Sequence, residues 1–102
     1  MTEAQLLLKQ HLSELGLETV CEYRFMKERR FRFDLANVKR RIAFECCGGH
    51  WTGGHRRAGA IKLDYAKMNL ATANKWRCYW FTNEQILSGQ AREFMRNVLE
   101  AK

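Results

Sequence analysis

Hydrophobic and polar positions follow two different periods along the chain, and the change of period separates helices from strands. Thr2 can cap a helix that begins at Glu3 and that Gly16 ends. The apolar side of this helix is predicted at Leu6, Leu7, His11, Leu12 and Leu15. β-Branched and aromatic residues then predict a first strand over residues 17–25. Residues 31–35 alternate, so a second strand is predicted with Phe31, Phe33 and Leu35 on one face and Arg32 and Asp34 on the other.

The third predicted strand is the most apolar part of the chain. Residues 42–47, IAFECC, are typical of a central strand that is covered on both faces. Residues 60–74 predict a helix and residues 76–82 a fourth strand, and this succession implies a right-handed crossover between parallel strands. A last amphipathic helix, capped by Asn83 or Ser88, follows with its apolar side at Ala91, Phe94, Met95, Val98 and Leu99. We therefore predict an α/β fold with a mixed four-stranded sheet flanked by helices, in the order α-β-β-β-α-β-α.

Two acidic residues interrupt these strands. Asp34 lies in the alternating second strand, and Glu45 lies in the apolar third strand. A carboxylate inside an apolar strand costs several kcal/mol to desolvate unless a positive group pairs with it. Adjacent strands with one acid each, followed by a glycine-rich loop over residues 48–59, indicate a divalent-metal site beside a phosphate-binding surface. The alternative is an ordinary strand ion pair with Arg32 or Arg41.

Length and charge narrow the function. The 102 residues are enough for one domain, residues 1–102, and too few for two. Eighteen Lys and Arg against eleven Asp and Glu give a net charge of +7, the balance expected of a protein that binds polyanions, with nucleic acid as the first expectation. The alternative is a basic protein with no nucleic-acid partner. The predicted DNA contacts are Trp51, His55, Arg56 and Arg57 in the loop, with Arg29 and Arg30 in the turn before the second strand. Trp51 could instead cap the core.

Cysteine usage and the N-terminus indicate the compartment. The segment MTEAQLLLKQ is not a secretory signal, and no apolar run approaches the ~18 residues needed to cross a membrane. We therefore expect no membrane association and a reducing, cytoplasmic location for the four cysteines. Cys46 and Cys47 point to opposite faces of a strand, which disfavours a disulfide between them.

The order and spacing of these pieces resemble the PD-(D/E)XK nuclease superfamily, in particular small phage and bacterial members related to the very short patch repair endonucleases. The resemblance covers nearly the whole chain and rests on RFDLA, AFECCGGHWTGGHRRAG, KLDYAKMNLA and WRCYWFT. It implies a restriction-endonuclease-like core in the cytoplasm of a bacterial or phage-infected cell. The implied activity is metal-dependent DNA endonuclease hydrolysis of phosphodiester bonds, in DNA repair, recombination or phage DNA metabolism.

The resemblance also implies roles for individual residues. Mg²⁺ or Mn²⁺ would be held by Asp34, Glu45 and the backbone carbonyl of Cys46. The family's lysine, which positions or activates the attacking water, would stand at Cys47, where this chain departs from the pattern. Lys67 on the following helix is similar to the lysine of branches in which this residue has moved. Lys62 is a second choice.

Several alternatives stay open at this level. His50 or His55 could act as the base. Zinc could bind Cys46, Cys47, His50 and His55, although their spacing matches no common zinc pattern. Lys67 could be a solvated residue paired with Asp64. The chain could also be a catalytically degenerate DNA-binding module, which Cys47 favours. The DNA structure recognised, its sequence and the oligomeric state, a homodimer included, are left open.

Overall fold

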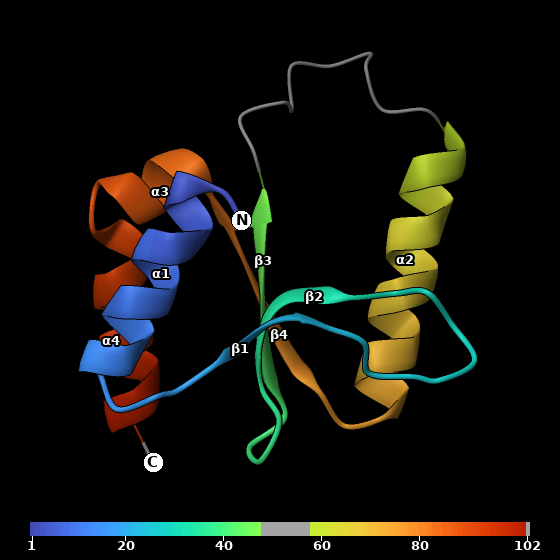
Figure 1. The fold of residues 1–102 in the computed structure, drawn as a ribbon, viewed down its shortest axis with the longest axis horizontal. Coiled ribbons are helices and arrows are strands. Elements are labelled where there is room, and N and C mark those ends of the chain that lie inside the picture. Colours follow the sequence, from blue (N-terminus) through green and yellow to red (C-terminus); the bar gives the residue numbers. More distant parts are fainter. Residues whose placement is uncertain (48–57, 102) are drawn as a thin grey trace.

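The computed structural model describes residues 1–47 and 58–101, and it does not describe the side chains of residues 58–64. The elements are α1 (Glu3–Glu14), β1 (Val20–Tyr23), β2 (Phe33–Asn37), β3 (Ile42–Cys47), α2 (Ala58–Ala73), β4 (Arg77–Thr82), α3 (Asn83–Leu87) and α4 (Gln90–Glu100). They form a mixed sheet in the order β1-β2-β3-β4, with α2 on one side and α1, α3 and α4 on the other (Figure 1). The predicted fold class is confirmed, with α3 as one short helix more than predicted.

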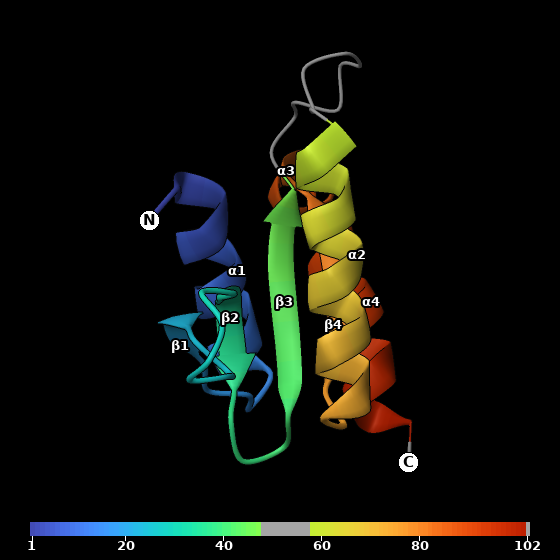
Figure 2. The same ribbon diagram turned by 90° about the vertical axis from the view of Figure 1, so that its right-hand side faces the viewer.

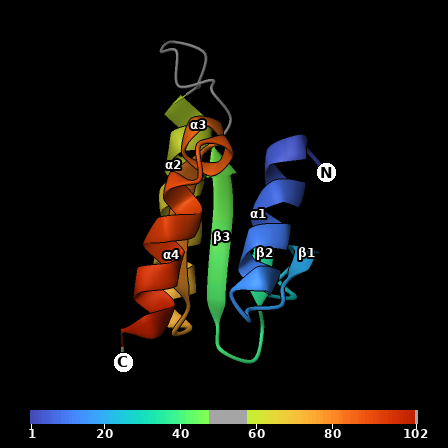
Figure 3. The ribbon, with the colours of Figure 1, turned by 90° about the vertical axis from the view of Figure 1, so that its left-hand side faces the viewer.

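The connections of the sheet follow the predicted pattern. β1 pairs antiparallel with β2, and β2 pairs antiparallel with β3. β3 pairs parallel with β4 through the α2 crossover, as the strand-helix-strand succession predicts. Figure 2 shows α2 in front of the sheet, and Figure 3 shows α1 and α4 over the opposite face. β3 therefore lies between two strands and two helical layers, which explains its apolar sequence.

Local signals place the first helix correctly but misplace part of its buried face. Thr2 and Gln5 form a capping box, in which each side chain accepts a hydrogen bond from the other residue's backbone N–H. The chain leaves the helix at Gly16, whose φ of +89° is the left-handed conformation that glycine adopts readily. The buried stripe is Ala4, Leu8 and Leu12, whereas Leu6 is 54% exposed. The prediction for Leu6 was wrong because the helix presents its i, i+4 stripe to the sheet.

The first strand is shorter than predicted. Of residues 17–25, only Val20–Tyr23 pair with β2. The chain then turns, and the Arg24 guanidinium donates hydrogen bonds to the carbonyls of Lys27 and Arg29. These bonds hold the connection between β1 and β2, which passes toward α2 (Figure 1).

The core is divided by the sheet into two clusters. The larger lies between the sheet and α1, α3 and α4 and contains Leu35 and Phe44, while the smaller lies on the α2 side and contains Phe33, Ala71 and Trp76. The prediction that Phe33 and Leu35 share a face was therefore wrong. Alternation along β2 is interrupted at Asp34, which lies opposite Glu22 of β1. Glu22 has a φ of +53° and forms no ladder pair.

The C-terminal helices begin differently from the prediction. Thr82, not Asn83 or Ser88, caps α3 through a second capping box with Gln85. α4 then starts after Gly89. Ala91 and Met95 are buried as predicted and Val98 and Leu99 pack against the larger cluster, but Phe94 is 49% exposed. In the described part of the chain, we find no helix with the length and apolar character that crossing a membrane requires.

Candidate active site

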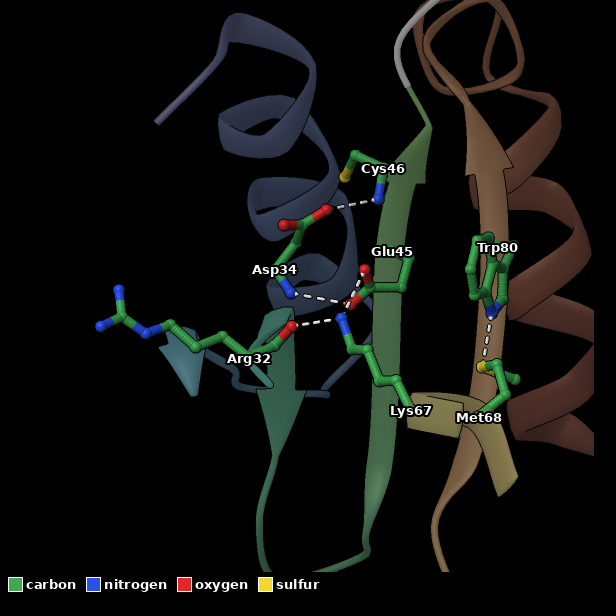
Figure 4. A network of polar contacts seen from close by, with 7 residues as sticks. All are labelled: Arg32, Asp34, Glu45, Cys46, Lys67, Met68 and Trp80. Atoms are coloured by element: carbon green, nitrogen blue, oxygen red, sulfur yellow. Dashed lines mark hydrogen bonds and ion pairs between the residues drawn. The ribbon is translucent and has the colours of Figure 1, made fainter. Parts of the chain in front are cut away.

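The two strand acids meet where the pairing of β2 with β3 ends. The last ladder pair is Leu35 with Phe44, and the same register would next place Asp34 opposite Glu45. Here the backbone N–H groups donate to carboxylate side chains and not to backbone carbonyls across the strand pair. The Asp34 N–H donates to Glu45 Oε2 at 3.1 Å, and the Cys46 N–H donates to Asp34 Oδ2 at 2.7 Å (Figure 4). The two carboxylates are thus fixed by each other's strands, and the prediction that Asp34 and Glu45 lie together is confirmed.

Helix α2 brings Lys67 to this pair. Ala71, fully buried on the sheet, lies one helical turn after Lys67, so both residues face the sheet. Trp80 Nε1 lies 3.1 Å from Met68 Sδ, and Trp80 is the β4 residue in register with Glu45. These contacts set α2 beside the acids.

The Lys67 ammonium is in contact with Glu45. Its Nζ lies 2.9 Å from Glu45 Oε1 and also donates to the backbone carbonyl of Arg32 (Figure 4). Lys67 is only 9% exposed. The alternative of a solvated Lys67 is therefore wrong.

Glu45 carries the clearest electrostatic perturbation of the site. Burial raises the pKa of its carboxyl above the ordinary value, and the charge of Asp34 adds to this, while Lys67 acts in the opposite direction. The direction shows that burial outweighs the attraction of Lys67. A carboxylate held in this way gains from additional positive charge.

Burial also governs two thiols close to these acids. It raises the pKa of Cys46 to about 12, with further contributions from the charges of Asp34 and Glu45. It raises the pKa of Cys78 to about 11, again with a contribution from Glu45. Neither thiol is a nucleophile near neutral pH, because the thiolate is the reactive form.

The backbone of Cys46 faces the acids as well. The Arg77 N–H donates to the Arg41 carbonyl, so in the parallel ladder Ala43, Glu45 and Cys47 point their backbone groups toward β4. The backbone groups of Cys46 consequently point toward β2, as its N–H bond to Asp34 shows. Its carbonyl oxygen is directed to the same side of β3 as the Asp34 carboxylate.

The donor set fits a hard divalent cation. Asp34 and Glu45 offer carboxylate oxygens, and Cys46 offers a carbonyl oxygen on the same side, which are the ligands that Mg²⁺ and Mn²⁺ prefer. Only one of the Asp34 oxygens accepts a hydrogen bond from a described residue. Among the described side chains, those of residues 1–47 and 65–101, no group of three or more His, Cys, Asp and Glu residues that could hold a metal is found. The zinc alternative depends on His50 and His55, which lie outside the described residues.

The ordinary strand ion pair does not describe this site. The Arg32 side chain points away from both acids, and this residue contributes its carbonyl instead (Figure 4). The Arg41 guanidinium donates to the carbonyl of Asn74. Among the described residues, the cation paired with Glu45 is Lys67.

The predicted DNA contacts divide into two groups. Trp51, His55, Arg56 and Arg57 lie outside the described residues, as does His50, and the same holds for the side chains of Lys62 and Asp64. Arg29 and Arg30 are exposed in the turn that Arg24 braces. Because β2 runs antiparallel to β3, this turn leads into the sheet at the end of β3 that carries Glu45 and Cys46.

Three features of the site are not evident from the sequence. The Arg32 carbonyl binds Lys67, the Phe33 ring centroid lies 5.5 Å from Lys67 Nζ, and Arg24 braces the basic turn. A carbonyl has no sequence signal. The i, i+4 spacing of Lys67 and Ala71 is the one signal that could have placed Lys67 on the sheet side of α2.

Comparison with known proteins gives one structural match. The chain is similar to the solved structure "Homing Endonuclease I-Bth0305I Catalytic Domain", with a TM-score of 0.72 and 12% sequence identity, over 95% of this chain and 93% of that chain. No protein-family model and no curated protein matches the chain. At 12% identity the match establishes a shared fold.

Proposed function

We propose that this chain is a metal-dependent DNA endonuclease with a PD-(D/E)XK-type site. The observation that carries the proposal is the convergence of Asp34 and Glu45 from adjacent strands on a buried lysine from the crossover helix. The structural neighbour is the catalytic domain of a homing endonuclease, and a shared fold over nearly the whole of both chains supports the same class of chemistry. The net charge of +7 supports a polyanionic substrate.

Each residue of the site has a distinct part in this proposal. Asp34, Glu45 and the Cys46 carbonyl would hold Mg²⁺ or Mn²⁺, which when bound would supply Lewis acidity toward a phosphodiester oxygen. Lys67 would orient the attacking water and offset negative charge that develops on the phosphate. Asp34 also fixes the Cys46 peptide, because its Oδ2 accepts the Cys46 N–H.

Lys67 accounts for the departure at Cys47. The ammonium expected on the strand is supplied from α2, and it reaches Glu45 across 22 residues of sequence. The thiol of Cys47 is assigned no part in the chemistry. This arrangement favours an active enzyme over a degenerate DNA-binding module.

The turn that contains Arg29 and Arg30 is a candidate surface for DNA contact. Arg29 and Arg30 are exposed at the end of the sheet that carries the acids, and Arg24 holds the turn through two carbonyls. Guanidinium groups bind phosphate oxygens in bidentate geometry. We infer that this turn and the loop residues Arg56 and Arg57 contact the phosphate backbone of the DNA.

The test is a cleavage assay on supercoiled plasmid and on branched DNA, with Mg²⁺, Mn²⁺ or EDTA. Wild type should nick or linearise DNA with either metal and not with EDTA. Asp34→Ala and Glu45→Ala should each abolish cleavage while DNA binding persists, because they remove oxygen ligands without adding bulk.

Cys47→Ala is the matched control and should retain near wild-type activity. Full cleavage by Asp34→Ala or Glu45→Ala would refute the metal site. Binding of DNA without cleavage under any divalent metal would replace the proposal with the degenerate binding module.

A further inference from the structure

The Lys67 ammonium has an aromatic neighbour in addition to its two oxygen acceptors. A lysine ammonium has three N–H donors, and the described acceptors are Glu45 Oε1 and the Arg32 carbonyl. The ring centroid of Phe33 lies 5.5 Å from Nζ. This distance is within the range at which the negative face of an aromatic ring attracts a cation.

The Phe33 ring is held rigidly by other rings. It stacks on Phe25 at 4.4 Å between centroids with an interplanar angle of 11°, and it lies 4.9 Å from Trp76. Phe33 is fully buried. Because water is excluded on this side, the attraction between the ring and the ammonium is worth more than at an exposed site.

We propose that Phe33 is a positioning residue for Lys67. Its ring face offsets part of the cost of burying the ammonium and keeps Nζ between Glu45 and the Arg32 carbonyl. Without the attraction of the Phe33 ring face, fewer interactions offset the conformational entropy that the flexible Lys67 side chain loses in the site. Phe33 is placed for this role because it lies in the smaller cluster, on the α2 side of the sheet from which Lys67 comes.

The catalytic consequence rests on the proposed endonuclease function, but the contact itself does not. The contact is tested by a double-mutant cycle on the free energy of unfolding, with no DNA or metal present. Phe33 is replaced with 3,4,5-trifluorophenylalanine, which nearly keeps the size of the ring and weakens its negative face. The replacement is made both in wild type and in Lys67→Met.

The expected result is a coupling of about two- to fivefold in the unfolding equilibrium constant. Packing changes caused by the fluorine atoms occur in both backgrounds and cancel in the cycle. The matched control is Phe44, which is also fully buried but lies in the cluster on the opposite face of the sheet. Trifluorination at Phe44 should show no coupling to Lys67.

A second measurement follows the catalytic step. With 4-fluoro, 3,5-difluoro and 3,4,5-trifluoro rings at Phe33, kcat should fall stepwise while KM stays constant, and the same series at Phe44 should leave kcat unchanged. A coupling of zero at Phe33 overturns the contact, whether or not DNA is cleaved. A coupling with constant kcat across the Phe33 series overturns the positioning role. An inactive wild type with the coupling present refutes the endonuclease and its positioning residue but leaves the contact established.

Discussion

Replacement of Lys67 with methionine should destabilise the protein in a manner that depends on pH. The methionine keeps most of the apolar length of the side chain and removes the ammonium, so the buried Glu45 carboxylate loses the cation 2.9 Å away. The Glu45 side chain is only 14% exposed, and solvent cannot replace that partner. Removal of one partner of a buried ion pair costs about 3 to 5 kcal/mol. For a domain of this size, the lower figure corresponds to a fall in Tm of about 15 °C.

The sign of the pH dependence follows from Glu45. Burial raises the pKa of Glu45 in the folded protein. The stability that this carboxyl group contributes is therefore fully present below its ordinary pKa of 4.5 and is lost as pH rises through the raised pKa. Lys67 lowers this pKa through its charge and its hydrogen bond. In Lys67→Met the pKa of Glu45 therefore rises further. The destabilisation should be largest at neutral pH and smaller near pH 5.

The assay is urea unfolding of both proteins from pH 5 to pH 8, followed by circular dichroism. Lys39→Met is the matched control, because Lys39 is exposed in the turn between β2 and β3, and it should change stability by less than about 0.5 kcal/mol. Glu45→Gln in the Lys67→Met background should recover much of the loss, since it removes the buried Glu45 charge that has lost its partner. A loss that is independent of pH, or no larger than that of Lys39→Met, would refute the reasoning.

Three further predictions concern DNA, metal and thiol chemistry. Replacement of both Arg29 and Arg30 with alanine should weaken DNA binding, measured by fluorescence anisotropy at several salt concentrations. The dependence of log K on log salt concentration should become shallower by about one unit for each phosphate that the variant no longer binds. Arg77→Ala, at the opposite end of the sheet, is the control, and an unchanged slope in the double variant would place the DNA elsewhere. Binding of Mn²⁺ should release protons at pH values below the raised pKa of Glu45, and the Mn²⁺ affinity should rise with pH. Calorimetry in two buffers of different ionisation enthalpy measures the proton release. Binding without proton release would contradict the prediction. The thiol of Cys46, with a pKa of about 12, should react with a thiol reagent at pH 8 far more slowly in the folded protein than in urea. Peptide mass mapping follows the modification of Cys46 in both states. Equal rates would count against the burial of this thiol.

Sequence patterns predicted the elements whose signals are local. The bounds of β3, Ile42–Cys47, match the prediction because an apolar run of only six residues is typical of a strand covered on both faces. The start of α1 at Glu3 follows from the capping box of Thr2 and Gln5, which lie three residues apart. The parallel pairing of β3 with β4 follows from the crossover rule.

The same patterns failed where a choice depended on contacts. Phe33 and Leu35 alternate in sequence, yet they lie in different clusters because the strand pairing is interrupted beside Glu22. Leu6 has the period of a buried residue, but the packing direction of α1 leaves it in solvent. Sequence periodicity describes a regular strand or an isolated helix. It does not describe the neighbouring elements against which each one packs.

The sequence by itself indicated that two acids occupy adjacent strands ahead of a basic loop, and that Cys47 stands where the family that the chain resembles carries a lysine. Only the tertiary structure decided which cation is paired with Glu45. Lys67 lies 22 residues from Glu45 and 35 from Arg32, and no local period relates positions so far apart. Their meeting depends on how α2 packs on the sheet, through Ala71 in the smaller cluster and Met68 against Trp80. That packing is a property of the whole fold, because the surface on which α2 packs is built from strands that are distant in sequence.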